Sequence, residues 1–250
     1  MIPAHPAIRF LLTFVPVFLC YQAAEGIGIR MLHSALWQAV FMLATIPLAL
    51  LLGKVIHGAP LRAFAMEGRP GALAWLSGMF LLAIAGKAIA VMLGAGLGVY
   101  SVQAPAASQD AAAVLKAIGT ILFITFIPSL AEDILTRGLL LRKGPLRAGA
   151  AFVIFSTAVY VLNHVYRLAN GPMEWFMLAC FGIAYATACA RFDSLWPAVG
   201  LHWGWNAASG LLGLVAEVET RQPGWAVVMS AGTHLVFALV CIRAARGRVN

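Results

Sequence analysis

Long runs of apolar residues dominate this chain, and short polar breaks separate them. A helix that crosses a bilayer needs about 20 mostly apolar residues. About eight segments reach that length, and they lie near residues 7–24, 33–54, 72–98, 114–141, 149–168, 173–191, 194–215 and 224–243. The connections between them are short, and the sequence has no evident internal repeat. The pattern predicts an all-α, polytopic membrane bundle in a single integral membrane domain, residues 1–250.

The composition agrees with this reading. Hydrophobic residues make up 62% of the chain and charged residues only 10%, whereas a soluble domain carries about 25% charged residues. The net charge of +8 does not indicate nucleic-acid binding, because Lys and Arg in a membrane protein mostly set the topology. Most basic residues fall on one set of alternating connections, which places both termini in the cytoplasm. We expect the first apolar segment to be a retained helix rather than a cleaved signal peptide.

Three of the apolar segments contain polar residues that are costly to place in a membrane. Glu132, Asp133 and Arg137 occur in ITFIPSLAEDILTRGLLL, and His164 ends FVIFSTAVYVLNH. His202 and Asn206 occur in SLWPAVGLHWGWNAASGLLGL. Because such groups cost least when they share partners, the sequence predicts one site between helices. The four cysteines lie in apolar segments without a CxxC pair, so neither a disulfide framework nor a structural zinc site is indicated.

The spacing of the residues in each motif predicts which side chains lie on the same face of a helix. Asp133 and Arg137 are four residues apart and can pair, while Glu132 points about 100° away and is free for another partner. Pro128 favours a kink in this helix. The alternative is a charged helix end whose side chains extend to the membrane surface.

The two histidine motifs have the same spacing. Tyr160 and His164 share one face, and so do His202 and Asn206. The second pair can present ring and amide N–H groups to a developing oxyanion. Alternatively, each histidine packs structurally, and Asn163 or Asn206 forms hydrogen bonds between helices.

A carboxylate beside a neutral histidine in a dry site can take a proton from water. The chain has no GxSxG, no cysteine beside a histidine, and no HExxH. These residues therefore favour attack by an activated water on a carbonyl carbon, with His202 and Asn206 stabilising the tetrahedral anion. Counting about 1.5 Å per residue from the helix ends places Glu132, His202 and Asn206 about 12–18 Å deep, but His164 about 22 Å deep. Helix tilt must absorb that difference if His164 is to join the site.

In this order, EDxxxRG, YxxxH and SLWPAVGLHWGWN resemble the CPBP intramembrane proteases, which include CAAX prenyl endopeptidases and Abi-like bacterial members linked to bacteriocin processing and immunity. FGIAY at residues 181–185 is also similar to the family. The resemblance covers residues 128–210 and implies a catalytic core there. It implies an endopeptidase that cleaves a membrane-associated protein or peptide near its terminus. Glu132 would activate water, with His164, His202 and Asn206 as further catalytic residues and Asp133, Arg137 and Tyr160 in support.

Two positions depart from the family pattern, since Asp133 replaces the usual Glu and Tyr160 the usual Phe. The family's chemistry has been described both as metal-dependent and as glutamate-based. Here the residues favour a site with no metal or other cofactor. In the alternative, Glu132, His164 and His202 would bind zinc.

The expected partners are membrane lipid and a peptide or protein substrate, lipidated or carrying a C-terminal sorting signal, and not nucleic acid. The expected location is the bacterial inner membrane.

Two other functions remain open at this point. Lys87, inside GMFLLAIAGKAIAVML, and the Asp133–Arg137 pair fit a transporter or channel with a buried ion network. That alternative requires repeated, broken helices in both halves, which the sequence does not display. The other function is a catalytically silent, peptide-binding immunity protein. The intact glutamate, histidines and asparagine weigh against that function.

Overall fold

The computed structural model describes residues 5–105 and 110–246. Helices dominate it, and a small two-stranded sheet lies at one end. The elements are α1 (Pro6–Ala23), η1 (Ala24–Met31), α2 (Ala35–His57), η2 (Arg62–Phe64), α3 (Ala72–Gly96), β1 (Tyr100–Gln103), α4 (Ala111–Asp133), η3 (Ile134–Gly138), α5 (Leu139–Lys143), α6 (Gly149–Asn163), η4 (Val165–Asn170), α7 (Pro172–Phe192), α8 (Trp196–Leu212), β2 (Glu217–Thr220) and α9 (Pro223–Arg246).

These elements form one continuous rod for each predicted apolar segment. Helix α1 runs directly into the π-helical η1, and α4 runs through η3 into α5. Within the described residues, six rods are long and apolar enough to cross a membrane. Helices α6 and α8 are shorter, with 15 and 17 residues. The predicted all-α bundle is confirmed, the chain is an integral membrane protein, and eight is an approximate number of crossings.

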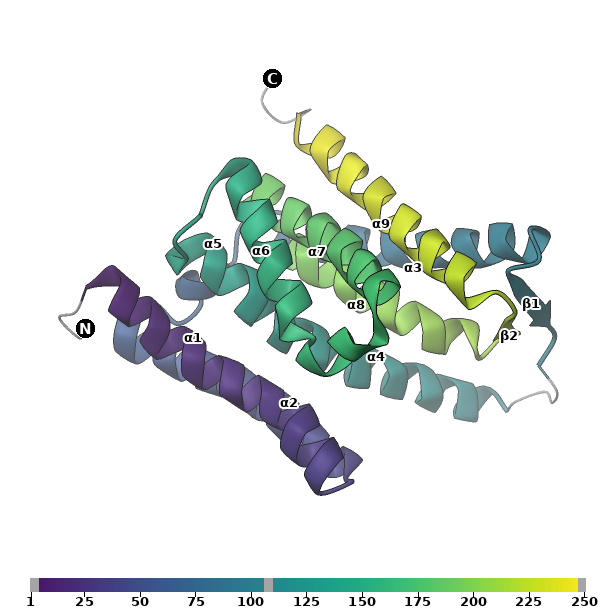
Figure 1. The fold of residues 1–250 in the computed structure, drawn as a ribbon, viewed down its shortest axis with the longest axis horizontal. Helices are drawn as coiled ribbons and strands as arrows, with labels where there is room; N and C mark the ends of the chain where they lie inside the picture. Colours follow the sequence, from purple (N-terminus) through teal and green to yellow (C-terminus); the bar gives the residue numbers. More distant parts are fainter. Residues whose placement is uncertain (1–4, 106–109, 247–250) are drawn as a thin grey trace.

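Helices α1 and α2 form a hairpin along one side of a bundle made by the remaining helices (Figure 1). Capping residues define both ends of α2. Ser34 caps the start of α2 by accepting the backbone N–H of Trp37, and Gly58 ends α2 in the left-handed conformation with φ of 69°. Glycine takes that conformation without strain. The hairpin contributes little to the buried core, which lies mainly in the bundle, and α7 and α8 supply a large share of it.

Helix α8 packs closely against α3, and two glycines permit the approach. A Cβ atom at Gly200 would lie 2.4 Å from the backbone oxygen of Leu76, and one at Gly204 would lie 2.4 Å from that of Phe80. Small residues four apart are a common solution for close helix contacts in membranes. His202 lies between the two glycines in the sequence, so this contact fixes the position of the helix that carries it.

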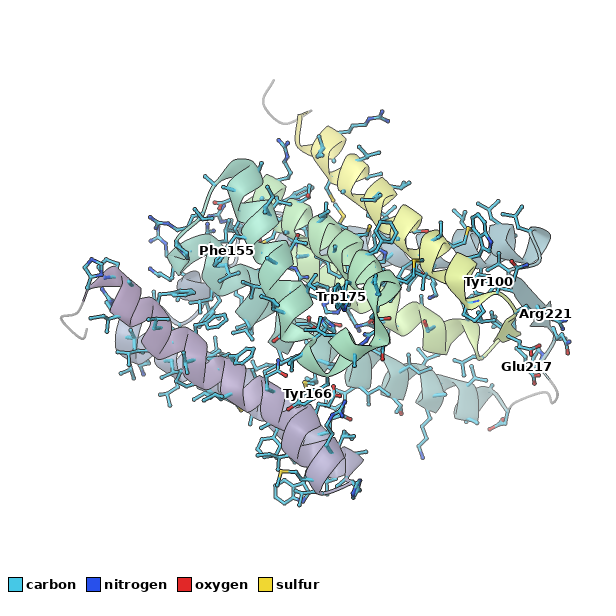
Figure 2. All side chains as sticks on the ribbon, viewed as in Figure 1. Tyr100, Phe155, Tyr166, Trp175, Glu217 and Arg221 are labelled. Atoms are coloured by element: carbon cyan, nitrogen blue, oxygen red, sulfur yellow. The ribbon has the colours of Figure 1, made fainter. Side chains whose placement is uncertain are left out.

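Strands β1 and β2 close the opposite end of the bundle from the first residues of α1. They pair in antiparallel register, with Tyr100 opposite Thr220 and Gln103 opposite Glu217. Figure 2 shows Tyr100, Glu217 and Arg221 gathered at this end. The hydropathy pattern does not predict this sheet, since each strand has only four residues.

Candidate active site

The two adjacent acids lie where the backbone of the fourth rod changes its winding. Pro128 interrupts the hydrogen bonding of α4 one turn before Glu132, because proline has no backbone N–H. After Asp133 the chain continues as the π-helix η3, residues Ile134–Gly138. Such wider turns occur often at functional sites. Glu132 and Asp133 consequently face different neighbours.

Asp133 lies at the centre of a buried group that we call the aspartate cluster: Asp133, Arg137, Tyr160, Tyr185 and His202. Its Oδ1 atom accepts a hydrogen bond from Nη1 of Arg137 and lies 3.2 Å from Nδ1 of His202. The Arg137 guanidinium lies over the rings of Tyr160 and Tyr185, 4.5 and 4.9 Å from their centroids. The predicted Asp133–Arg137 pair is therefore present. Both side chains are 0% exposed, so the alternative of a charged helix end at the membrane surface is wrong.

Glu132 belongs to a second group, the glutamate cluster, which consists of Glu132, Tyr21 and His164. Oε2 of Glu132 accepts a hydrogen bond of 3.0 Å from the hydroxyl of Tyr21, a residue of α1. Oε1 lies 3.7 Å from Nδ1 of His164. Oε1 is buried and has no hydrogen-bond partner among the described residues. The cluster therefore spans the boundary between the hairpin and the bundle, and one carboxylate oxygen stays uncommitted.

His164 joins the site despite the greater depth that residue counting assigned to it. It follows the last residue of α6, and its Nδ1 lies 2.8 Å from the backbone oxygen of Tyr160. A carbonyl oxygen only accepts, so Nδ1 carries the proton in this hydrogen bond. His164 is thus both a residue bonded to its own helix and a neighbour of Glu132. Because the two lie in contact, the helices must tilt or begin at different levels.

Asn206, like His202, lies on α8 and contacts α4, but its contact on α4 is one turn away from that of His202. Its Nδ2 atom donates to Oγ of Ser129, at 3.1 Å, and Ser129 donates to the backbone oxygen of Thr125. His202 and Asn206 were expected to share one face and to point to a common region. They do share α8, yet each has its own partner on α4, namely Asp133 for His202 and Ser129 for Asn206.

Contacts beyond Tyr21 fasten the hairpin to the bundle near the site. Gln22 donates from Nε2 to the backbone oxygen and to Oδ1 of Asn163, at 2.7 and 2.8 Å. The guanidinium of Arg30 lies 4.5 Å from the ring centroid of Tyr166, and Figure 2 shows Tyr166 between the bundle and the hairpin. The interhelical role considered for Asn163 is therefore present, with a partner in the first helix.

Three residues near the site escaped the sequence analysis. Tyr21 and Ser129 carry no special signal, since tyrosine and serine are ordinary in membrane helices. His234 of α9 lies at hydrogen-bond distance from the Tyr185 hydroxyl, 2.9 Å, and stacks on Phe181 with centroids 3.5 Å apart. It sits in the apolar run WAVVMSAGTHLVFALV. The rule that exposed the other intramembrane histidines applies to it equally.

Lys87 has an aromatic partner rather than an acidic one. Its Nζ atom lies 4.3 Å from the ring centroid of Trp205, and a cation over an indole face is attracted by the ring quadrupole. Trp205 packs in turn against His234, with centroids 4.4 Å apart. Lys87 is therefore linked through Trp205 and His234 to Tyr185 of the aspartate cluster.

The donor set does not form a metal site. Among residues 5–105 and 110–246, no three His, Cys, Asp or Glu side chains are grouped to hold an ion. Glu132 and His164 approach each other, while His202 faces Asp133. The three alternative zinc ligands therefore do not converge.

The candidate site is closed in this structure. Glu132 is 4% exposed and His202 5% exposed. Four hollows in the described part of the chain are lined by other residues. That Glu132, His164, His202 and Asn206 line one cavity stays a prediction, and all four contact or neighbour the same stretch of α4.

Comparison with protein families gives a match to residues 114–208, described as Rce1-like, a type II CAAX prenyl endopeptidase. Comparisons with curated proteins and with solved structures gave no match. The matched segment contains every residue supplied by the three polar motifs. The match supports an endopeptidase in general terms. Over residues 114–208 the chain is similar to the type II CAAX prenyl endopeptidases, and the resemblance to the CPBP intramembrane proteases is confirmed.

Proposed function

We propose that this protein is an intramembrane endopeptidase that hydrolyses a peptide bond near the terminus of a membrane-associated protein or peptide. The observation that carries the proposal is the state of Glu132. Its Oε2 is held by Tyr21, while Oε1 is buried, without a hydrogen-bond partner in the described chain, and 3.7 Å from His164. A fixed carboxylate with one free oxygen in a dry site suits a general base.

In the proposed reaction, Oε1 of Glu132 takes a proton from water, and the oxygen of that water attacks the scissile carbonyl carbon. The carbonyl oxygen becomes an anion. When the intermediate collapses, the C–N bond breaks and Glu132 returns the proton to the leaving amine. His164 lies beside Oε1 and helps to orient the water. Each step conserves protons within the site, and the free carboxylate is regenerated.

His202 and Asn206 support the anion in this proposal. Asp133 accepts from Nδ1 of His202, which fixes the ring and leaves Nε2 for the substrate; a protonated ring beside Asp133 donates from Nε2. Asn206 uses one amide hydrogen on Ser129, and its amide nitrogen has a second. Fixed donors of this kind contribute strongly when the site excludes water. Arg137 and Tyr160 hold Asp133 in place.

The closed site constrains how a substrate enters. Tyr21 lies on the hairpin and Glu132 on the bundle, so a peptide must separate these two elements to reach Oε1. The proposed substrates are lipidated proteins or proteins with a C-terminal sorting signal, since both are delivered within the membrane. The reaction needs no metal in this proposal. The proposed location is the bacterial inner membrane, with both termini in the cytoplasm.

The test compares the peptides of membrane and secreted fractions from cells that carry the wild-type protein or Glu132→Gln. We expect one class of substrate with a shortened terminus in the wild type alone. Gln keeps the shape and most hydrogen bonds of Glu but cannot accept a proton from water. Identical terminal peptides in both strains, with equal protein levels, would contradict the proposal.

A further inference from the structure

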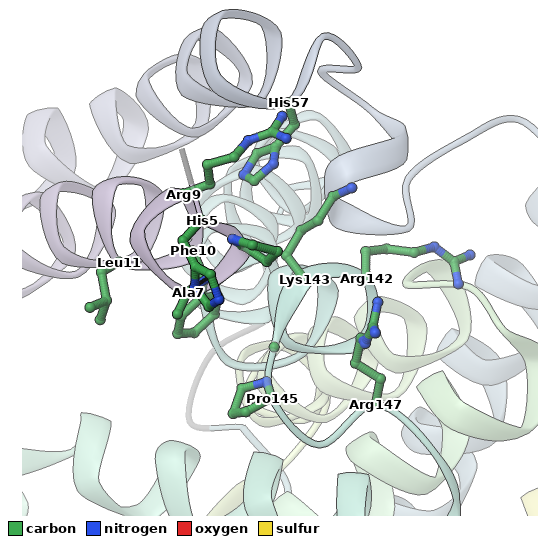
Figure 3. Close-up of a pocket in the computed structure, with 12 residues that line it drawn as sticks. His5, Ala7, Arg9, Phe10, Leu11, His57, Arg142, Lys143, Pro145 and Arg147 are labelled. Carbon is green, nitrogen blue, oxygen red and sulfur yellow. Dashed lines mark hydrogen bonds between the residues drawn. The ribbon is translucent and has the colours of Figure 1, made fainter. Parts of the chain in front are cut away.

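A hollow of about 610 Å³ lies at the end of the bundle where α1 begins, between α1, the end of α2 and the connection from α5 to α6 (Figure 3). It is far along α1 from Tyr21 and contains none of the candidate active-site residues. Its lining residues are His5, Pro6, Ala7, Arg9, Phe10, Leu11, His57, Arg142, Lys143, Gly144, Pro145 and Arg147.

The lining is basic and has no acidic member. Arg9, Lys143 and Arg147 surround the opening, together with Arg142 (Figure 3). Arg9 is held in position because it donates to the backbone oxygen of Ile56, with Nε at 3.1 Å. The hollow therefore concentrates positive charge at one place between two helical rods.

Within residues 5–105 and 110–246, no acidic side chain pairs with three of these cations. All nine acidic residues of the sequence lie in the described part of the chain. At this end of the bundle the acids are Glu67 and Asp193, and both pair with Arg69 and Arg142. Among the described residues, Arg9, Lys143 and Arg147 have no ion-pair partner. Like charges held together this way gain from an anion between them.

The remaining wall of the hollow is apolar and continues onto the lipid-facing side of α1. Phe10 and Leu11 belong to this wall, and Leu11 is 53% exposed on a helix that is long and apolar enough to cross a membrane. A free inorganic anion gains nothing from such a wall. A phospholipid uses both parts, because its phosphate meets the cations and its acyl chain follows the apolar helix face.

We propose that this hollow is a binding site for the headgroup of an anionic phospholipid. The phosphate contacts Arg9, Lys143 and Arg147, and an acyl chain lies along Phe10 and Leu11. Arg9 belongs to the hairpin, whereas Lys143 ends the rod that carries Glu132 and Asp133. The lipid therefore bridges these two parts of the molecule at the membrane surface.

The test measures lipid adducts on the purified, delipidated protein by native mass spectrometry. The probes are phosphatidylglycerol, phosphatidylcholine and inorganic phosphate. The variant Lys143→Ala/Arg147→Ala removes two lining cations. Its matched control, Arg191→Ala/Arg243→Ala, removes two exposed cations that do not line the hollow and have no ion pair in the described chain.

We expect tight adducts with phosphatidylglycerol and weak ones with phosphatidylcholine. Each basic side chain at a membrane surface contributes roughly a fivefold gain in affinity, so the lining variant should bind phosphatidylglycerol about 30-fold more weakly. The control should keep the wild-type affinity. Equal losses in both variants would overturn the proposal in favour of general surface charge. Competition by inorganic phosphate as effective as by phosphatidylglycerol would overturn the lipid as the occupant.

Discussion

The side chains of Glu132 and Asp133 leave the same turn of helix and enter two different surroundings. Asp133 is bound by a cation and a histidine that are both buried in the bundle, and its helix holds the arginine in place. Glu132 is bound by one tyrosine from a separate hairpin and approaches its histidine without a hydrogen bond. Each carboxylate keeps one buried oxygen without a hydrogen-bond partner in the described chain, Oδ2 of Asp133 and Oε1 of Glu132. The difference is that Asp133 is committed to an ion pair with Arg137, whereas Glu132 has only Tyr21 and His164 beside it and is available for proton transfer in the proposed reaction.

The sharpest test of this comparison neutralises each acid separately. Glu132→Gln should lower the cleavage rate by about 10²–10⁴-fold, the usual contribution of general base catalysis, and leave the thermal unfolding midpoint unchanged. Asp133→Asn should lower the folded yield, because Arg137 loses its buried counter-charge. Cleavage assays and thermal unfolding in detergent measure both effects. An active Glu132→Gln protein would contradict the proposed base, as would activity that EDTA abolishes and zinc restores.

Removal of the cation tests the aspartate cluster from the other side. Arg137→Ala leaves a fully buried carboxylate without its partner, which costs about 3–5 kcal/mol of folding free energy. We expect low folded yield and a lowered unfolding midpoint, with Arg191→Ala as the exposed control. A stable and active Arg137→Ala protein would show that the cluster is not needed to hold the site.

The donors on α8 test whether the two clusters act together. His202→Ala and Asn206→Ala should each lower kcat by about 10²–10³-fold, the usual loss for one oxyanion donor. KM should change much less, because the charge that they stabilise develops only in the transition state. Steady-state kinetics on a cleavable peptide separates the two constants. An effect confined to KM would assign both residues to substrate binding instead.

A smaller change concerns the contact between hairpin and bundle. Tyr21→Phe removes the hydrogen bond to Oε2 of Glu132 and lets the carboxylate rotate. A hydrogen bond to a charged group contributes roughly 1.5–3 kcal/mol, and we expect kcat to fall about tenfold because only part of this is lost. Tyr166→Phe is the matched control, since Tyr166 also faces the hairpin and contacts Arg30 through its ring and its backbone oxygen, both of which Phe keeps. Equal activities in both variants would remove Tyr21 from the site.

The smallest expected effect lies outside the membrane. Burial alone would raise the pKa of Asp193, but hydrogen bonds and charge from Arg142 and Arg69 lower it below its ordinary value. A carboxyl group with a lowered folded-state pKa adds stability above its unfolded pKa of about 4, and this is lost as the pH falls through the folded pKa. The unfolding midpoint should therefore decline slightly less below about pH 4 in Asp193→Asn than in the wild type. Identical pH profiles would show that Asp193 adds nothing.

Much of this molecule follows from its sequence because lipid imposes a strong rule on composition. The apolar runs predict the helical rods, and Glu132, His164 and His202 stand out because ionisable groups in such runs are rare. The same rule applies to His234. Tyr21 could not be found in this way, because a tyrosine near a helix end has an ordinary explanation at the membrane interface.

Other features depend on local backbone geometry, which the pattern of apolar and polar residues does not predict. The π-helix of residues 134–138 differs from an α-helix by one extra residue per turn, and hydropathy does not distinguish the two. That turn decides which neighbours Asp133 and Arg137 meet. The separate partners of His202 and Asn206 on α4 likewise depend on how α8 packs against other helices, and helical spacing alone gives only a shared face.

The hydrogen bond between Tyr21 and Glu132 joins residues 111 positions apart in the sequence. The segment similar to the type II CAAX prenyl endopeptidases begins only at residue 114, so the hairpin whose Tyr21 contacts the proposed general base lies outside it. Chemistry and access are therefore encoded in separable stretches of the chain. An exchange of residues 5–57 for another hairpin that keeps a tyrosine at position 21 is expected to alter which peptides are admitted while Glu132, His164, His202 and Asn206 stay the same. New selectivity can then arise by recombination at the loop after α2, provided that the contact between Tyr21 and Glu132 is retained.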